Sequence, residues 1–327
     1  MEVLDQGVNP IFTDPDPDKA REFFRQKSRA MVDKRMTEKE AVEKFVHDGD
    51  YFAAGGFGAN RIPNSILHEI VRQRKKNLGF LGHTSTHDFQ VLAAGKCFNR
   101  CDAAYIVGLE ARGLSPNARK YIQSGEVQLT EWSNYALDAR LKAAADGVSF
   151  GIIRSLLGTD TFKMSAAKVI ECPFTGKKYA AVPACWPDVV AIHVHEADMY
   201  GNCIIKGISV ADMELARAAK HLIISTEKIV SNSVIREDPT RTAIPFYMVD
   251  AVVEAPYGSY PGNMAYCYFS DEVHLAQWMK VEKDPEEFAK FLDHYIYSCA
   301  NFEEYIEKCG GLKRIEELQK LENVVEA

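Results

Sequence analysis

The chain has 327 residues and a formal net charge of -7, with an apolar content near that of average soluble globular proteins. Its length suits one large α/β domain or two smaller ones. No basic run marks a nucleic-acid surface, no apolar run is long enough to span a bilayer, and the opening residues lack the features of a signal peptide. We therefore expect a cytoplasmic protein that binds neither nucleic acid nor a membrane.

Residues 1–35 differ from the rest of the chain. Asp14–Asp18 alternates acidic residues with proline, and a polar, helix-like stretch follows from Ala20 to Lys34. We interpret this part as an N-terminal extension outside the core fold, which either clasps a partner or is a partly ordered tail. The core domain, residues 36–327, begins at Thr37, which forms a capping box with Glu40.

Strand-like and helix-like patterns alternate through this core domain. Strands are predicted at 51–54, 78–82, 103–107, 127–130, 148–153, 189–195, 222–226 and 249–254, and helices at 65–74, 116–123, 135–145 and 210–219. The alternation indicates an α/β fold with a doubly wound, mostly parallel sheet and helices on both faces. We expect a small β subdomain at about 160–185 and a tail of three amphipathic helices at about 284–327.

Eight cysteines are scattered along the chain without a C-x-x-C pair or a second pair at zinc-ligand spacing. This pattern favours reduced thiols, many of them buried, and no zinc site. The cysteines are Cys97, Cys101, Cys172, Cys185, Cys203, Cys267, Cys299 and Cys309.

A glycine-rich loop follows the predicted strand at 51–54. Gly55, Gly56 and Gly58 allow positive φ and close approach to the backbone, and a helix begins near Pro63. A strand, a glycine loop and a helix in this order are typical of a site for a charged or polar ligand. The glycine spacing matches neither the dinucleotide fingerprint nor the phosphate-binding loop, so a nucleotide site is not predicted.

The same stretch resembles the first signature of the family I coenzyme A transferases. That signature has an Asp-Gly pair, three apolar residues, Gly-Gly-Phe and a proline; here they are Asp48-Gly49, Phe52–Ala54, Gly55-Gly56-Phe57 and Pro63. Arg61 stands where the common pattern has glycine, and an arginine there is more like the glutaconate CoA-transferase branch. Two later blocks, His195–Asn202 and Val249–Gly262, are also similar to this family, the second to its glutaconate-type α subunit, so the resemblance covers about residues 36–300.

The resemblance implies an enzyme that moves coenzyme A between an acyl-CoA and a carboxylic acid. In this family a glutamate carboxylate attacks the thioester to give an acyl-glutamyl anhydride, and the released thiolate then forms a glutamyl-CoA thioester. That glutamate lies in a Ser-Glu-Asn-Gly-like motif of the β half, and this chain does not contain the motif. We therefore expect an α subunit whose separate β subunit supplies the nucleophile, in an α2β2 or larger particle. Coenzyme A thioester is then a substrate, and no permanently bound cofactor is expected.

The glycine loop is the first candidate site. By the resemblance, Gly55, Gly56, Phe57 and Gly58 lie beside the partner's glutamate, and their backbone N–H groups would hold the thioester oxygen as an oxyanion. The alternative is a structural turn between strand and helix. For Arg61, a clamp on a substrate carboxylate is weighed against an exposed arginine at the helix entry.

The loop after the strand at 78–82 lies where open α/β sheets bind ligands. His83, Thr84, Ser85 and Thr86 are therefore candidate substrate contacts. His83 and His87 have the i, i+4 spacing of a metal pair, but a third ligand is missing, so no metal site is predicted.

Glu131 is the candidate general base if the enzyme is a hydrolase, because the neighbouring Trp132 ring would raise its pKa. The alternative is a surface or helix-capping acid, which is also the interpretation of Glu110. His193 and His195 alternate on a strand and share a face, where one of them is expected to be a packed core histidine.

Three functions remain open at this point. The leading one is the α subunit of a heteromeric CoA-transferase acting on a short or medium carboxylic acid. The second is a hydrolase of the same fold that opens a ring of a β-keto acyl-CoA, as in steroid degradation. The third, a ligand sensor without enzyme activity, has no DNA-binding helix or basic segment to support it.

Overall fold

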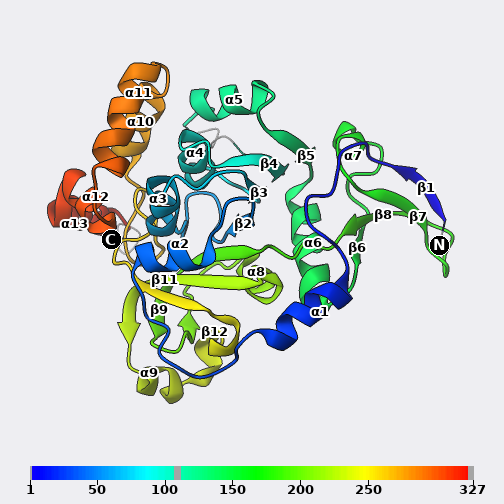
Figure 1. The fold of residues 1–327 in the computed structure, drawn as a ribbon, viewed down its shortest axis with the longest axis horizontal. Helices are drawn as coiled ribbons and strands as arrows, with labels where there is room; N and C mark the ends of the chain where they lie inside the picture. The colour runs from blue at the N-terminus through cyan, green and yellow to red at the C-terminus, as the bar shows by residue number, and fades with distance from the viewer. Residues whose placement is uncertain (1, 107–111, 323–327) are drawn as a thin grey trace.

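The structure is a computed structural model that describes residues 2–106 and 112–322. In this part of the chain, seven parallel strands run in the order β13-β11-β9-β2-β3-β4-β5, and the antiparallel strands β10 and β12 extend the sheet beside β9 (Figure 1). The strands of this main sheet are β2 (Tyr51–Ala54), β3 (Leu78–Gly82), β4 (Phe98–Ala103), β5 (Gln128–Glu131), β9 (Val189–Asp198), β10 (Cys203–Ile204), β11 (His221–Val230), β12 (Thr242–Ile244) and β13 (Ala251–Glu254).

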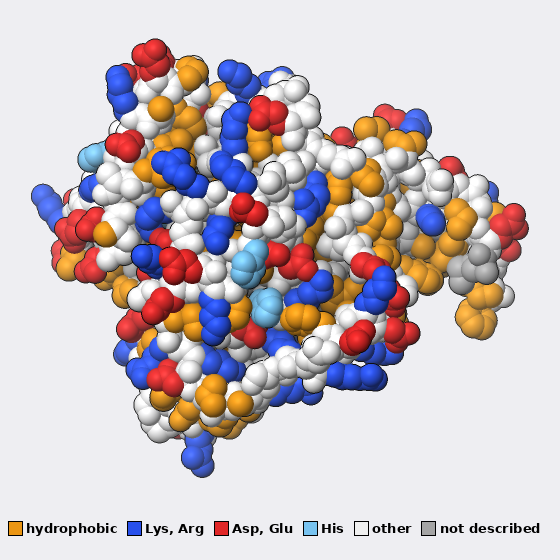
Figure 2. Space-filling model, in the orientation of Figure 1, with side chains coloured by type: hydrophobic (Ala, Val, Ile, Leu, Met, Phe, Trp, Pro, Cys, Tyr) orange, Lys and Arg blue, Asp and Glu red, His pale blue; other side chains and the backbone are white. Residues whose placement is uncertain are grey.

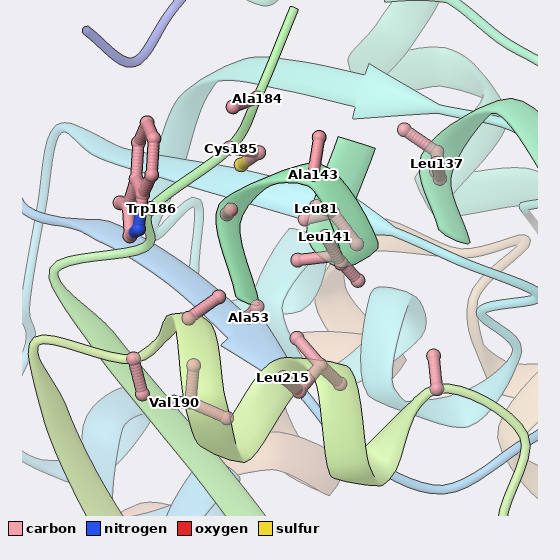
Figure 3. Close-up of a cluster of buried hydrophobic side chains, with 14 of the residues drawn as sticks. Ala53, Leu81, Leu137, Leu141, Ala143, Ala184, Cys185, Trp186, Val190 and Leu215 are labelled. Carbon is pink, nitrogen blue, oxygen red and sulfur yellow. The ribbon is translucent and has the colours of Figure 1, made fainter. Parts of the chain in front are cut away.

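Helices cover both faces of the main sheet. Successive side chains of a strand point to opposite faces, and here both faces carry apolar side chains that are buried under helices. Phe52 and Phe80 belong to one buried cluster with residues of α2 (Glu38–Phe45), α3 (Asn64–Arg72) and α4 (His87–Ala94). Their chain neighbours Ala53 and Leu81 belong to another, with residues of α6 (Asn134–Asp146) and α8 (Asp212–Ala218). Figure 3 shows this second cluster, in which Leu137 and Leu141 of α6 and Leu215 of α8 lie around the sheet residues. The predicted doubly wound α/β fold is confirmed.

Local signals set several helix boundaries. Thr37 and Glu40 form the predicted capping box at the start of α2. Ser115 caps α5 (Pro116–Gln123), which has proline in its first turn, and Gly147 ends α6 with a left-handed backbone.

A second, four-stranded antiparallel sheet forms a lobe on the right of Figure 1. Its order is β1-β7-β8-β6, with β1 (Val3–Gln6), β6 (Phe150–Ile153), β7 (Lys168–Glu171) and β8 (Lys178–Pro183). A short helix, α7 (Asp160–Lys163), joins β6 to β7. The lobe therefore begins before the predicted 160–185 and recruits a strand from the N-terminal extension. In the view of Figure 2, hydrophobic side chains gather on parts of this lobe, with acidic and basic groups along its rim.

Two strand predictions need correction. The strand predicted at 148–153 pairs with β8 in the small sheet, not with the main sheet. The strand predicted at 103–107 is β4, which ends at Ala103, so the apolar run that suggested it begins only at the carboxyl end of the strand. Its last part, from 107, lies outside the described residues. β4 includes the polar Asp102, which is buried beside Arg140 of α6, with 2.8 Å between a carboxylate oxygen and Nη1.

The N-terminal extension packs against both sheets of the same chain. After β1 it reaches α1 (Pro17–Gln26), and Lys27 then forms a buried ion pair with Asp250 at 2.7 Å. Val252 of β13 donates its N–H to the Lys34 carbonyl and accepts from the Met36 N–H. The extension thus ties the small sheet to the edge of the main sheet.

The C-terminal part contains α10 (Glu272–Val281), α11 (Pro285–Leu292), a π-helical turn (Asp293–Tyr297), α12 (Phe302–Lys308) and α13 (Gly311–Glu322). α9 (Asn232–Glu237) follows β11, and two short 3-10 turns flank β12, Pro239–Arg241 and Phe246–Met248. In the described ranges, no helix is both long and apolar enough to cross a bilayer.

Candidate functional site

The glycine loop lies at the carboxyl end of β2, next to the loop that follows β3. Its backbone N–H groups are occupied within the chain. Gly55 donates to the Ala191 carbonyl at 2.8 Å and Gly56 to the Asp212 carboxylate at 2.9 Å. Phe57 donates to the Asn60 carbonyl at 2.9 Å and Gly58 to the Thr84 carbonyl at 3.1 Å.

These bonds correct the expectation that the four N–H groups are free to hold an oxyanion. At the tip of the loop, the N–H of the half-buried Ala59 makes no hydrogen bond to a described residue. The Phe57 side chain is 39% exposed, so the tip of the loop faces out of the molecule. Grooves of about 400 and 360 Å³ lie elsewhere, beside α5 and α11 and beside β13 and α12.

Arg61 faces the interior. Its side chain is fully buried, and its Nη2 lies 2.5 Å from the Asp212 carboxylate and 2.5 Å from the Ile208 carbonyl. Arg61 also has a left-handed backbone, with φ of 58°, which turns the chain at this point. The exposed-arginine interpretation is wrong, because the guanidinium is buried and paired with Asp212. The clamp on a substrate carboxylate stays a prediction, and such a carboxylate would have to compete with this buried pair.

The loop after β3 packs directly on the glycine loop. Gly58 and Ser85 form an isolated parallel bridge, and the Thr86 hydroxyl donates to the Gly58 carbonyl at 2.6 Å. Ser85 donates a hydrogen bond to the Asp88 carboxylate. The hydroxyls of Ser85 and Thr86 are therefore used within the chain.

Thr84 differs from its neighbours. Its φ is 46°, a left-handed conformation that is uncommon for a β-branched residue, and its buried hydroxyl has no hydrogen-bond partner. His83 lies beside it, with its ring 6.2 Å from the Phe57 ring. Burial lowers the pKa of His83, which keeps the ring neutral near pH 7. Backbone strain and an unpaired buried hydroxyl in one residue are typical of a ligand contact.

His87 and Asp88 begin α4 beneath this loop. His87 is buried against Trp278, and its pKa is lowered to about 3 by burial. Its Nδ1 lies 3.1 Å from the Gln90 side chain, so it belongs to the packing of α4. Asp88 accepts the Thr86 N–H at 2.6 Å, and burial raises its pKa to about 6.

A buried polar network lies behind the glycine loop, and sequence reasoning missed it. His193 is within 2.8 Å of both the Ser225 hydroxyl and the Glu227 carboxylate. Glu227 also accepts the Tyr268 hydroxyl at 2.7 Å and the Tyr257 N–H at 2.8 Å. The network fixes the segment 257–268, whose Asn263 carbonyl accepts the Arg61 N–H at 2.9 Å. In the sequence, the block 249–262 was the part that pointed to this region. It indicated similarity to the family but did not predict these hydrogen bonds.

His195, on the same strand as His193, is also buried. Its Nδ1 accepts the Lys206 N–H at 3.0 Å, and its Nε2 lies 2.9 Å from the Ala265 carbonyl. Burial lowers its pKa to about 4. Both histidines of β9 are therefore packed inside, whereas the sequence predicted this for one of them.

Glu131 ends β5 and is half-buried. Its N–H donates to the Met164 carbonyl, and its carboxylate makes no hydrogen bond or ion pair with a described residue. The Trp132 ring lies against the Arg140 guanidinium and donates to Asp102 at 2.6 Å. Glu110 lies outside the described residues. Within residues 2–106 and 112–322, no group of three or more His, Cys, Asp or Glu side chains is arranged to hold a metal.

Comparison with known proteins defines the class to which this fold and loop belong. The coenzyme A transferase family model matches residues 35–255, and the chain belongs to that family. The resemblance predicted from the glycine loop is confirmed.

Individual relatives narrow the class to one type of subunit. The A subunit of glutaconate CoA-transferase from Acidaminococcus fermentans is 33% identical over 304 residues, covering 87% of this chain and 94% of the relative. The crystal structure of glutaconate CoA-transferase from that organism matches with a TM-score of 0.84 and 31% identity, over 87% of this chain and 95% of the other. The A subunit of 3-oxoadipate CoA-transferase from Pseudomonas knackmussii is 33% identical, over 83% of this chain and 96% of the relative.

A more distant relative carries a different activity in its name. The cholesterol ring-cleaving hydrolase IpdA subunit of Rhodococcus jostii is 26% identical over 275 residues, covering 81% of this chain and 92% of the relative. The two transferase A subunits are more similar to this chain than this hydrolase subunit is, at 33% against 26% identity. This agrees with the α subunit predicted from the sequence.

Proposed function

We propose that this chain is the α subunit of a heteromeric CoA-transferase that moves coenzyme A between an acyl-CoA and a carboxylic acid. The observation that carries the proposal is the glycine loop after β2, rigidly held and exposed at Phe57, in a chain that matches the corresponding subunit of two transferases. A separate β subunit supplies the glutamate nucleophile. Glutaconate and 3-oxoadipate, named in those relatives, define the first acids to test.

We propose distinct roles for the residues of this site. The glycine loop forms a fixed surface against which the partner's glutamate and the thioester meet. The Thr84 hydroxyl and the Ala59 N–H make no hydrogen bond to a described residue, and we propose them as contacts to a substrate carbonyl or carboxylate. Preorganised donors of this kind contribute on the order of 3 kcal/mol to the transition state. Ser85 and Thr86 support this surface rather than touch the substrate.

The reaction begins at the partner's glutamate. Its carboxylate attacks the thioester carbonyl, and the carbon–sulfur bond breaks. The coenzyme A thiolate departs, and an acyl-glutamyl anhydride forms. The thiolate then attacks the glutamyl carbonyl, releasing the acyl group as its carboxylate and forming a glutamyl-CoA thioester. The incoming acid repeats these steps in reverse. A neutral His83 beside the loop adds no competing charge to the site.

The test is intact-protein mass spectrometry of this chain purified with its partner, after exposure to acyl-CoAs that include glutaconyl-CoA and 3-oxoadipyl-CoA. We expect a coenzyme A adduct on the partner chain that is lost after borohydride treatment. Release of free coenzyme A without an adduct on either chain would instead identify the hydrolase. In that second function the unpaired Glu131 carboxylate is the general base.

A further inference from the structure

Asp212 joins two elements that are far apart in the sequence. It is the first residue of α8, and its two carboxylate oxygens have different partners at the glycine loop. Oδ1 accepts the Gly56 N–H at 2.9 Å, and Oδ2 lies 2.5 Å from Nη2 of Arg61. The Asp212 and Arg61 side chains are 1% and 0% exposed, so both charges are compensated inside the protein.

The glycine loop is shaped around this carboxylate. A Cβ on Gly55 would lie 2.5 Å from Asp212 Oδ1, so the carboxylate occupies the space of a side chain at that position. Gly56 has a φ of +87°, and a Cβ there would lie 2.6 Å from the Asn60 carbonyl oxygen. The left-handed turn at Arg61 brings its guanidinium back beneath the loop. Gly55, Gly56 and Arg61 together surround the Asp212 carboxylate.

We propose that Asp212 is the positioning residue of the glycine loop, and that the buried Arg61 holds its carboxylate in place. The bond from Gly56 fixes the plane of the Gly55–Gly56 peptide, with the N–H directed inward and the Gly55 carbonyl directed the opposite way. The loop surface offered to the partner's glutamate is thereby set before any substrate binds. Asp212 does not touch the reacting atoms, and this role rests on the proposed function.

A first experiment measures the loop itself and needs no activity. Hydrogen–deuterium exchange of a peptide covering residues 53–60 is followed in the purified two-chain complex. Asp212→Ala should speed exchange of the Gly56 amide by about tenfold or more, because its charged acceptor is gone. The matched control is Asp250→Ala, which removes a partly buried carboxylate away from the glycine loop. Asp250 accepts the Leu222 N–H near the start of β11 and pairs with Lys27. Unchanged exchange at Gly56 in Asp212→Ala overturns the proposal.

A second experiment separates positioning from general stability. Relative to Asp250→Ala, Asp212→Ala should lower kcat by about tenfold or more and change KM by less than about threefold, because the displaced loop donor at Ala59 acts on the charge of the transition state while the proposed Thr84 contact is kept. Asp212→Asn keeps an oxygen acceptor for Gly56 and should recover part of kcat. This conservative variant also serves if the alanine variant fails to assemble.

Equal loss of kcat in the two alanine variants, or no recovery in Asp212→Asn, contradicts the positioning role. A wild-type complex that transfers coenzyme A from none of the acyl-CoAs contradicts the proposed function instead. The exchange measurement then still decides whether Asp212 holds the loop.

Discussion

At the scale of single residues, Gly56 and Gly58 show why two glycines of one loop are not equivalent. Both have a left-handed backbone, with φ of 87° and 63°. A Cβ on Gly56 would lie 2.6 Å from the Asn60 carbonyl oxygen, whereas a Cβ on Gly58 meets no atom within 4 Å. Only Gly56 is required by space as well as by conformation.

Gly56→Ala should therefore lower kcat by about 100-fold or more, because the loop must shift by a sizeable fraction of an ångström. Gly58→Ala is the matched control: it carries only the left-handed strain of about 1 kcal/mol and should keep kcat within about threefold. Steady-state kinetics of the assembled complex measures both. Equal activities of the two variants would contradict the role of the loop.

Thr84 is a residue at which binding and stability should respond in opposite directions. Thr84→Val removes a buried hydroxyl that has no partner, so the free energy of unfolding should rise by about 1 kcal/mol. If the hydroxyl contacts the substrate, KM should rise about tenfold at the same time. Thermal unfolding and steady-state kinetics give the two values.

Thr86→Val is the control for this prediction. It removes the hydroxyl that donates to the Gly58 carbonyl at 2.6 Å, so it should lower the free energy of unfolding by about 1 kcal/mol. A KM for Thr84→Val equal to that of the wild type would remove Thr84 from the substrate contacts.

Glu131 separates the two candidate activities. Glu131→Gln should leave transfer within about twofold, because the transferase nucleophile belongs to the partner, whereas a hydrolase would lose about 100-fold or more of its kcat without its general base. Glu126→Gln, which only breaks an exposed ion pair with Lys96, is the control. A large loss of transfer in Glu131→Gln alone would contradict the proposed division of roles.

At the scale of elements, the N-terminus of α4 carries a carboxyl group that the fold prefers to keep protonated. Asp88 is 6% exposed, and burial raises its pKa to about 6 from an ordinary value near 3.8. A raised carboxyl pKa means that the folded chain binds more protons than the unfolded one between these two values. The stability contributed by Asp88 therefore falls as the pH rises from about 4 to about 6.

Asp88→Asn removes this titration while keeping an oxygen acceptor for the Thr86 N–H. Its free energy of unfolding relative to the wild type should increase by about 2.4 kcal/mol between pH 4 and pH 7. Urea unfolding at the two pH values measures the difference. The same difference at both pH values would show that Asp88 does not titrate in this range.

At the scale of the whole molecule, the N-terminal extension connects two sheets. β1 completes the small sheet, and Lys27 and Lys34 bring the following segment to the edge of the main sheet. Lys27 is the buried anchor, since its side chain is 7% exposed and it also donates to the carbonyls of Lys220 and Met248.

Lys27→Met should destabilise the chain by about 3 kcal/mol, because it leaves the Asp250 carboxylate buried without its counter-charge. Lys19→Met breaks an ion pair with Asp14 that is exposed to water, and should leave the melting temperature nearly unchanged. Thermal unfolding of both variants tests the comparison. Equal melting temperatures would show that the extension is not anchored at Lys27.

The elements that the sequence predicted well depend on short-range signals. The helix at 116–123 was predicted from its helical pattern, and in the structure Ser115 and Pro116 start it. The helix α2 was predicted because Thr37 and Glu40 cap it. The strand at 103–107 was misplaced because an apolar run outside a strand has the same composition as one inside it. The small sheet was underestimated because β1 pairs with β7 across more than 150 residues.

The family, the type of subunit and the parallel α/β arrangement could be predicted from neighbouring residues, because motif order and the alternation of strands and helices are local signals. Which groups are available for chemistry depends instead on the folded chain. Asp212 lies 151 residues from Arg61 in the sequence, yet it pairs with the buried guanidinium and accepts the Gly56 N–H. The packing of the two loops leaves the Thr84 hydroxyl without a hydrogen-bond partner. The physical reason is that burial and hydrogen-bond partnership depend on contacts between distant segments, which no local pattern contains.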